Sequence, residues 1–274
     1  MSLTRWVVPC FVIPILAASG LADEPRPLPG TKPLILEGDI AASLVEGVDR
    51  FLLRKTEESI ANRARYWKPD CSSHEAYARS VEPNRRRLAE ILGAQDARVP
   101  FDGPELITTT SIPALIARGE GYEVFAVRWP TIGDLHGEGL LLAPKGRKIA
   151  DVVAIPDASQ TPEQIAGLAP GVPPESQYAR RLAESGCRVI VPAIIDRRIE
   201  PRNGRAKLST REYLYRPAFE LGRHLIGYEV QQVLAAVDWF AKDAGANDPA
   251  IGVFGWGDGG MLSLYAGALD PRID

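Results

Sequence analysis

The segment Gly255-Trp256-Gly257-Asp258-Gly259-Gly260 holds the residues of this chain whose types and spacing point most directly to chemistry. It follows an apolar stretch and precedes a helix-forming one, which is the setting of a nucleophile elbow, a sharp turn between a strand and a helix. Small residues are needed two positions before and after the nucleophile, and Gly255 and Gly259 meet this need if position 257 is central. A working elbow would carry Ser, Cys or Asp there, but this chain has Gly257.

Asp258 carries the nearest side chain that could replace the missing nucleophile, because a carboxylate can attack and form an ester intermediate. Centring the turn on Asp258, however, places Trp256 two residues before it, where the backbone is crowded. A phosphate-binding loop is another interpretation, since the segment matches G-x-G-x-x-G. That loop follows the first strand of a dinucleotide fold, whereas this one follows the last expected strand. The remaining alternative is a glycine-rich turn without chemistry.

The elements that would position this turn begin near residue 105, where short apolar runs alternate with helical patterns. Two hairpin-like strands followed by β-α-β-α-β predict an α/β fold with a mostly parallel sheet and helices on both faces. The expected helices are Pro174–Ser185, which starts at a proline, and Pro217–Asp243, whose apolar residues share one stripe. The expected strands are Tyr122–Trp129, Gly139–Ala143, Asp151–Ile155, Arg188–Ile194 and Ala250–Gly255.

The chain is expected to have four parts. Residues 1–22 carry Arg5, a proline-broken apolar run and a small residue at Ala22, which predicts a secretory signal peptide cleaved before Asp23. The run is too short for a membrane anchor, which needs about 20 apolar residues. Residues 23–37 are expected to form a proline-rich linker, 38–100 a helical region, and 101–274 the N-terminal part of an α/β domain that is incomplete at its C-terminal side. The protein is therefore expected to be secreted or periplasmic, without a membrane partner after cleavage.

The composition excludes several classes of function. A formal net charge of −3 excludes a nucleic-acid binder that works through bulk charge. No cysteine or histidine spacing indicates a metal, so neither a metal nor another cofactor is expected. Of the two cysteines beyond the signal, Cys187 opens an apolar run, which favours a buried free thiol over a disulfide with Cys71. The segment Asp196–Glu212 has six basic residues against three acidic ones and is interpreted as a solvated loop, with an acidic-carbohydrate site as the alternative.

Four blocks of sequence carry a family resemblance, and together they span about residues 60–274. They are Arg65-Tyr66-Trp67 through Asn84-Arg85, Ile155-Pro156-Asp157-Ala158, the segment 222–230 (GRHLIGYEV), and the turn around Gly257. With these blocks the chain resembles secreted α/β hydrolases of the acetylxylan esterase / dienelactone hydrolase type. The resemblance implies an α/β-hydrolase-like domain and a carboxylic ester hydrolase that acts on a small-molecule or carbohydrate ester.

The resemblance also assigns roles to residues near the turn. The serine of the family falls on Gly257, and its oxyanion hole falls on the backbone N–H of Asp258 and one from Asp157 or Ala158. The acid and histidine of the family follow the turn, whereas no histidine follows Gly257 here. We therefore expect little or no serine-type hydrolysis.

The alternatives are a non-catalytic ligand-binding pseudo-hydrolase and a truncated fragment of a longer hydrolase. In the fragment interpretation, a partner or a missing C-terminal segment covers the open edge of Ala250–Gly255, because exposed apolar edges are templates for aggregation.

Overall fold

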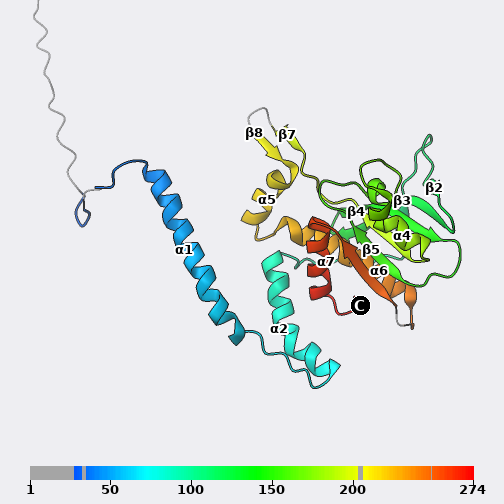
Figure 1. The fold of residues 1–274 in the computed structure, drawn as a ribbon, viewed down its shortest axis with the longest axis horizontal. Coiled ribbons are helices and arrows are strands. Elements are labelled where there is room, and N and C mark those ends of the chain that lie inside the picture. Colours follow the sequence, from blue (N-terminus) through cyan, green and yellow to red (C-terminus); the bar gives the residue numbers. More distant parts are fainter. Residues whose placement is uncertain (1–27, 33–34, 203–205, 248) are drawn as a thin grey trace, which may run out of the picture. The chain divides into compact units, whose positions relative to one another are not determined.

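The computed structural model describes residues 28–32, 35–202, 206–247 and 249–274 (Figure 1). The chain divides into two units, residues 1–62 and 63–274. In the first, helix α1 (Ile40–Asn62) begins where the Asp39 carboxylate accepts the N–H of Ala42 at 3.1 Å, and none of its residues is buried. The expected signal peptide, residues 1–22, lies outside the described residues.

The second unit opens with helical segments η1 (Arg63–Arg65) and α2 (His74–Leu92). Helix α2 starts at Ser73, whose hydroxyl accepts the N–H of Ala76, and ends at Gly93, whose φ of +67° lies in the left-handed region. A Cβ at Gly93 would also press on the backbone of His224, so glycine is required there for two reasons. The end of α2 therefore lies close to the start of the helix that follows His224.

A seven-stranded mixed sheet forms the centre of this unit, in the order β1-β3-β4-β6-β5-β9, with β2 paired to β3. Strands β6, β5 and β9 run parallel, and the other pairings are antiparallel. The α/β fold class is confirmed. The strand bounds are β1 (Glu105–Leu106), β2 (Leu115–Arg118), β3 (Tyr122–Ile132), β4 (Leu135–Pro144), β5 (Asp151–Ile155), β6 (Arg188–Pro192) and β9 (Ile251–Gly255).

Two apolar clusters cover the two faces of the sheet. Because side chains alternate along a strand, Val153 of β5 packs into the cluster of α6 (Leu225–Ala244) and α7 (Asp258–Leu269), whereas Val152 packs into the other. The second cluster includes residues of α3 (Pro162–Ile165) and α4 (Tyr178–Glu184), which is preceded by η2 (Pro174–Ser176). Strands β5 and β6 are thus buried on both sides along most of their length, which explains the apolar runs Val152–Ile155 and Val189–Val191.

The prediction of one helix over Pro217–Asp243 is wrong. The structure has α5 (Thr210–Glu220) and then α6, separated by a turn in which Gly222 has a φ of +68°. His224 begins α6, because its Nδ1 accepts the N–H of Ile226 at 3.1 Å. Apolar residues continue on both sides of this turn, so the sequence pattern gave no sign that the segment forms two helices.

The prediction of a loop over Asp196–Glu212 is also wrong. This segment forms the hairpin β7 (Ile199–Arg202) and β8 (Ala206–Ser209), followed by the first turn of α5. The Ser209 hydroxyl accepts the N–H of Glu212 at 3.1 Å and so caps that helix.

Cys71 is exposed and Cys187 is buried, and both are free thiols. Burial raises the pKa of the Cys187 thiol, with a further contribution from Asp151, which keeps it protonated at neutral pH. Over the described ranges, no helix has the length and apolar character needed to cross a membrane.

Candidate functional site

The turn between β9 and α7 has the backbone of a tight strand-to-helix elbow. Gly257 has φ +58° and ψ −122°, a conformation that is strained for residues with a side chain. A Cβ at Gly255 would overlap the backbone of Gly259, and one at Gly259 would overlap the carbonyl of Ile155. The two flanking glycines are therefore required by close approach of the backbone, as their spacing in the sequence indicated.

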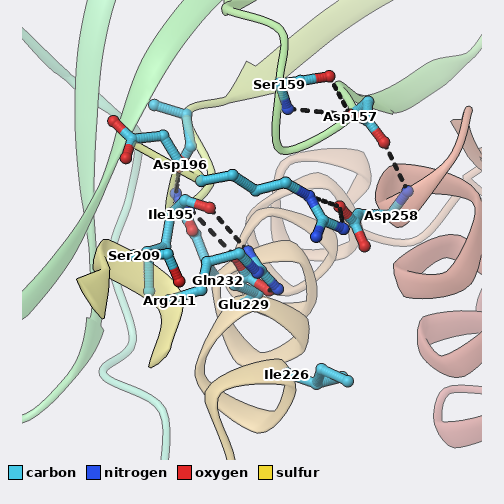
Figure 2. A network of polar contacts seen from close by, with 12 residues as sticks. Asp157, Ser159, Ile195, Asp196, Ser209, Arg211, Ile226, Glu229, Gln232 and Asp258 are labelled. Carbon is cyan, nitrogen blue, oxygen red and sulfur yellow. Dashed lines mark hydrogen bonds and ion pairs between the residues drawn. The ribbon is translucent and has the colours of Figure 1, made fainter. Parts of the chain in front are cut away.

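The carboxylate of Asp157 fills the space in front of Gly257. A Cβ added at Gly257 would overlap Asp157 Oδ2, and the same oxygen accepts the backbone N–H of Asp258 at 3.0 Å (Figure 2). The other oxygen, Oδ1, accepts the N–H of Ser159 at 2.9 Å and its hydroxyl at 2.5 Å. Burial disfavours the charged form, but these hydrogen bonds outweigh it and hold the pKa of Asp157 below its usual value. An ionised carboxylate therefore occupies this position at neutral pH.

The structure thus brings Gly257, Asp258 and Asp157 together, although Asp157 precedes the turn by a hundred residues. The N–H of Asp157 donates to Gln160 Oε1 at 3.2 Å, so this amide is engaged within its own loop. Ala158, the other residue expected in the oxyanion loop, is buried. The N–H of Asp258 already donates its hydrogen bond to the Asp157 carboxylate, so it is not free to bind an oxyanion.

The side chain of Asp258 is tied to an arginine. Its Oδ2 accepts from Arg197 Nη2 at 2.5 Å and from Nε at 3.2 Å. The Asp258 side chain is 14% exposed, and Arg197 reaches it from the segment between β6 and β7. A carboxylate held in this ion pair is a weaker nucleophile, since its charge is shared with the guanidinium.

A buried ion pair, missed from the sequence, anchors the segment that carries Arg197. Arg211 on α5 makes a two-pronged contact with Glu229 on α6, at 2.6 and 2.9 Å (Figure 2). Arg211 also donates to the carbonyl of Ile195 at 2.7 Å, and Glu229 accepts the N–H of Ile195 at 3.1 Å. Burial opposes the charge of Arg211, but its bonds to Glu229 outweigh this and raise its pKa. The cluster of basic residues in Asp196–Glu212 was visible in the sequence. Its partner Glu229 was not, because it lies within a helix whose pattern is otherwise apolar.

A cavity of about 530 Å³ lies beside the turn. It is lined by Arg197, Arg211, His224 and Asp258, together with side chains of β7, α5, α6 and α7. Burial, and then the charge of Arg211, lowers the pKa of His224. Because His224 Nδ1 accepts a backbone N–H, the neutral ring carries its proton on Nε2. His224 precedes Gly257 in the sequence and so does not match the histidine expected after the turn, yet the fold places it on the wall of the cavity.

The other two histidines occupy different surroundings. His74 is the first residue of α2, and His136 Nδ1 lies 3.0 Å from the carbonyl of Asp134 in the β3–β4 hairpin. Among the residues that the structure describes, no group of three or more His, Cys, Asp or Glu side chains is arranged to hold a metal ion. At the turn, the Asp258 carboxylate is instead paired with Arg197, and the Asp157 carboxylate accepts hydrogen bonds from Ser159 and from the N–H of Asp258.

Comparison with known proteins identifies the fold. No family model and no curated protein matches the chain. Among solved structures, the chain is similar to a putative acetyl xylan esterase from Bacteroides fragilis NCTC 9343, with a TM-score of 0.51 and 19% identity over 80% of this chain and 58% of that one. It is also similar to Methylesterase BT1017, with a TM-score of 0.50 and 15% identity over 80% of this chain and 44% of that one. The chain spans about half the length of these two proteins.

The sheet and the elbow define an α/β-hydrolase fold. Within that class, the fold is the one seen in acetyl xylan esterase-type structures, which confirms the resemblance noted in the sequence at the level of the fold. Identities of 15–19% show the fold alone. The chemistry of this chain therefore has to be argued from its own residues.

Proposed function

We propose that this chain is an exported α/β-hydrolase-fold protein of the carbohydrate-esterase type whose elbow does not hydrolyse esters by a serine mechanism. One observation carries the proposal: the nucleophile position is Gly257, and the carboxylate of Asp157 fills the space of its absent side chain. The same carboxylate accepts the N–H of Asp258, which would otherwise stabilise the oxyanion of a tetrahedral intermediate.

Two requirements of acyl transfer are thus unmet at once. Removing the nucleophile of a serine hydrolase lowers kcat by about 10⁶-fold, and removing one oxyanion donor by about 10²–10³-fold. A negative charge at the oxyanion position adds repulsion to the loss of a donor. Asp258 does not repair this, because its carboxylate is held by Arg197.

The class of ligand is supported by the fold. One similar structure is a putative acetyl xylan esterase and another a methylesterase. These names favour a small-molecule or carbohydrate ester as the class of ligand for this pocket. Export is supported by the pattern of residues 1–22. The partner class we propose is accordingly a small molecule or carbohydrate.

A second candidate function is ligand binding without turnover. The cavity of about 530 Å³ beside the turn favours it, because this space lies next to Gly257 and does not need a nucleophile to hold a ligand. Pockets of this size with a few convergent polar groups are typical of small-molecule sites. In this candidate, Arg197 and Arg211 on the wall would orient the ligand.

The purified full chain tests the first candidate with p-nitrophenyl acetate, acetylated xylan and a serine-directed fluorophosphonate probe. We expect no turnover above a heat-denatured control and no covalent label. Stoichiometric labelling of a serine, together with turnover that the probe abolishes, would contradict the proposal. Calorimetric titration with acetylated xylo-oligosaccharides then separates the candidates, because saturable binding without turnover supports the second.

A further inference from the structure

His224 is fixed in place where α6 begins. Its Nδ1 accepts the N–H of Ile226 at 3.1 Å. Its backbone lies against the end of α2, since a Cβ at Gly93 would lie 2.8 Å from the His224 backbone nitrogen. The neighbouring Arg223 is held by both carboxylate oxygens of Asp96, at 2.8 and 2.9 Å. The position of the imidazole is therefore set before any ligand arrives.

One nitrogen of this ring is left without a partner. Because Nδ1 is engaged, the neutral ring carries its proton on Nε2. Among the residues that the structure describes, none hydrogen-bonds Nε2, yet the atom is not enclosed by protein. The ring packs edge to face on Tyr215 with centroids 5.0 Å apart, and both side chains line the cavity of about 530 Å³. The Nε2–H is thus a donor that a ligand in this cavity can use.

The cationic groups of the same wall differ, because each is already bound to a carboxylate. Arg211 contacts Glu229 at 2.6 and 2.9 Å, and Arg197 contacts Asp258 at 2.5 and 3.2 Å (Figure 2). An anionic ligand has to compete with these carboxylates, whereas an uncharged acceptor oxygen needs only a free donor. Burial and then the charge of Arg211 lower the pKa of His224, so at neutral pH the ring adds no positive charge.

We propose that His224 is a ligand-binding residue of this cavity, whose Nε2–H donates a hydrogen bond to an uncharged oxygen of the ligand, such as an ester carbonyl or a sugar hydroxyl. This inference rests on ligand binding, the second candidate function above, and names a residue that determines its specificity. A site built around a donor discriminates against ligands that leave the donor unpaired. A neutral ligand is accordingly preferred over an acidic one of the same size.

Two substitutions separate the roles of the two ring nitrogens. His224→Asn keeps a side-chain oxygen that can accept the N–H of Ile226, as asparagine does at the start of helices, but it does not reach the position of Nε2. We expect unchanged stability in urea and about fivefold weaker binding of acetylated xylotriose in calorimetry, the effect of one hydrogen bond between neutral groups. His224→Gln reaches the position of Nε2 without capping α6, so it should lower stability and largely retain affinity.

Nitrogen NMR of the imidazole in the full chain gives a readout that a purely structural histidine would not move. We expect the Nε2 resonance of His224 to shift on saturation with acetylated xylotriose, while the Nδ1 resonance stays in place. A xylotriose that carries a uronic acid should bind more weakly than the acetylated one. Acetate release is followed in the same samples.

His136→Asn is the matched control. His136 is exposed in the β3–β4 hairpin and does not line this cavity, so the substitution should leave the dissociation constant unchanged. Unchanged affinity in His224→Asn, saturation without a shift at Nε2, or tighter binding of the acidic sugar would each overturn the inference and leave ligand binding itself intact. No saturable binding would remove the second candidate function together with the inference. Acetate release would instead contradict the proposed lack of hydrolysis.

Discussion

At the turn between β9 and α7, Gly257 and Asp157 depend on each other. Only a residue without Cβ leaves room for the Asp157 carboxylate, and that carboxylate satisfies the N–H of Asp258 at the start of α7. An anion near the first turn of a helix is stabilised by the exposed amides and the helix dipole. The pair therefore serves the stability of the helix, and in the function proposed above it also leaves the elbow without a nucleophile.

Replacing Gly257 tests this dependence. Gly257→Ser is expected to lower the free energy of unfolding by about 1–3 kcal/mol, because the backbone there is strained for a residue with Cβ and the new side chain displaces Asp157. Urea unfolding gives the value. Gly146→Ser is the control, because Gly146 has open space around it and should change little.

The double variant Gly257→Ser/Asp157→Ala isolates the contact itself. Its loss should be smaller than the sum of the two single losses, because the serine no longer meets a carboxylate. Strict additivity in the double-mutant cycle would show that the two positions do not compete for one space.

The charge of Asp157 gives stability a dependence on pH. Its pKa is lowered in the folded protein, so its contribution is fully present above the unfolded-state pKa of about 3.9 and is lost as pH falls through the folded value. Asp157→Asn should therefore be less stable than wild type at pH 7, with a difference that shrinks below about pH 4. Urea titrations between pH 3 and 7 measure it. A difference that is constant over this range would mean that the charge plays no part.

At the scale of elements, the Arg211–Glu229 pair joins α5, α6 and the segment after β6. The side chains are 13% and 1% exposed, so neither charge is well solvated. Both also bond to the backbone of Ile195, two residues before Arg197. The pair thereby sets the position from which Arg197 reaches Asp258.

Glu229→Gln leaves Arg211, whose side chain is only 13% exposed, without the carboxylate that it contacts directly. We expect a loss of about 3–5 kcal/mol in the free energy of unfolding, as for other broken buried ion pairs. Arg216→Ala, which removes an exposed pair with Glu212 on α5, should cost no more than about 1 kcal/mol. Equal effects of the two changes would show that the buried pair has no special role. Arg211→Met/Glu229→Leu should recover much of the loss, because no unpaired charge remains.

At the scale of the whole molecule, the sequence predicts those helices and strands that can be recognised from the pattern of their own residues. Asp151–Ile155 has the predicted bounds, because Val152–Ile155 form the continuous apolar run of a strand buried on both faces. The break between α5 and α6 was missed because apolar residues continue on both sides of Gly222. The contact of Asp157 with the turn, and the pairing of Arg211 with Glu229, depend on how separate segments meet in three dimensions, so no local pattern reveals them.

Export can be checked on the intact precursor. Expression in a secreting bacterial host should release a chain whose first residue is Asp23, because the pattern of residues 1–22 predicts cleavage after Ala22. Amino-terminal sequencing of the released protein reads the site directly. Retention of Met1 on protein that stays in the cytoplasm would contradict the expectation.

The mutual fit of Gly257 and Asp157 also constrains how this turn can change over generations. A serine acquired first must push a carboxylate aside, and loss of the carboxylate first leaves the N–H of Asp258 without its partner. Both single steps lead through a less stable intermediate, although the pair of changes together removes the conflict. Selection for stability would therefore disfavour each single step toward a nucleophilic turn, so the present pair resists change to such a turn one substitution at a time.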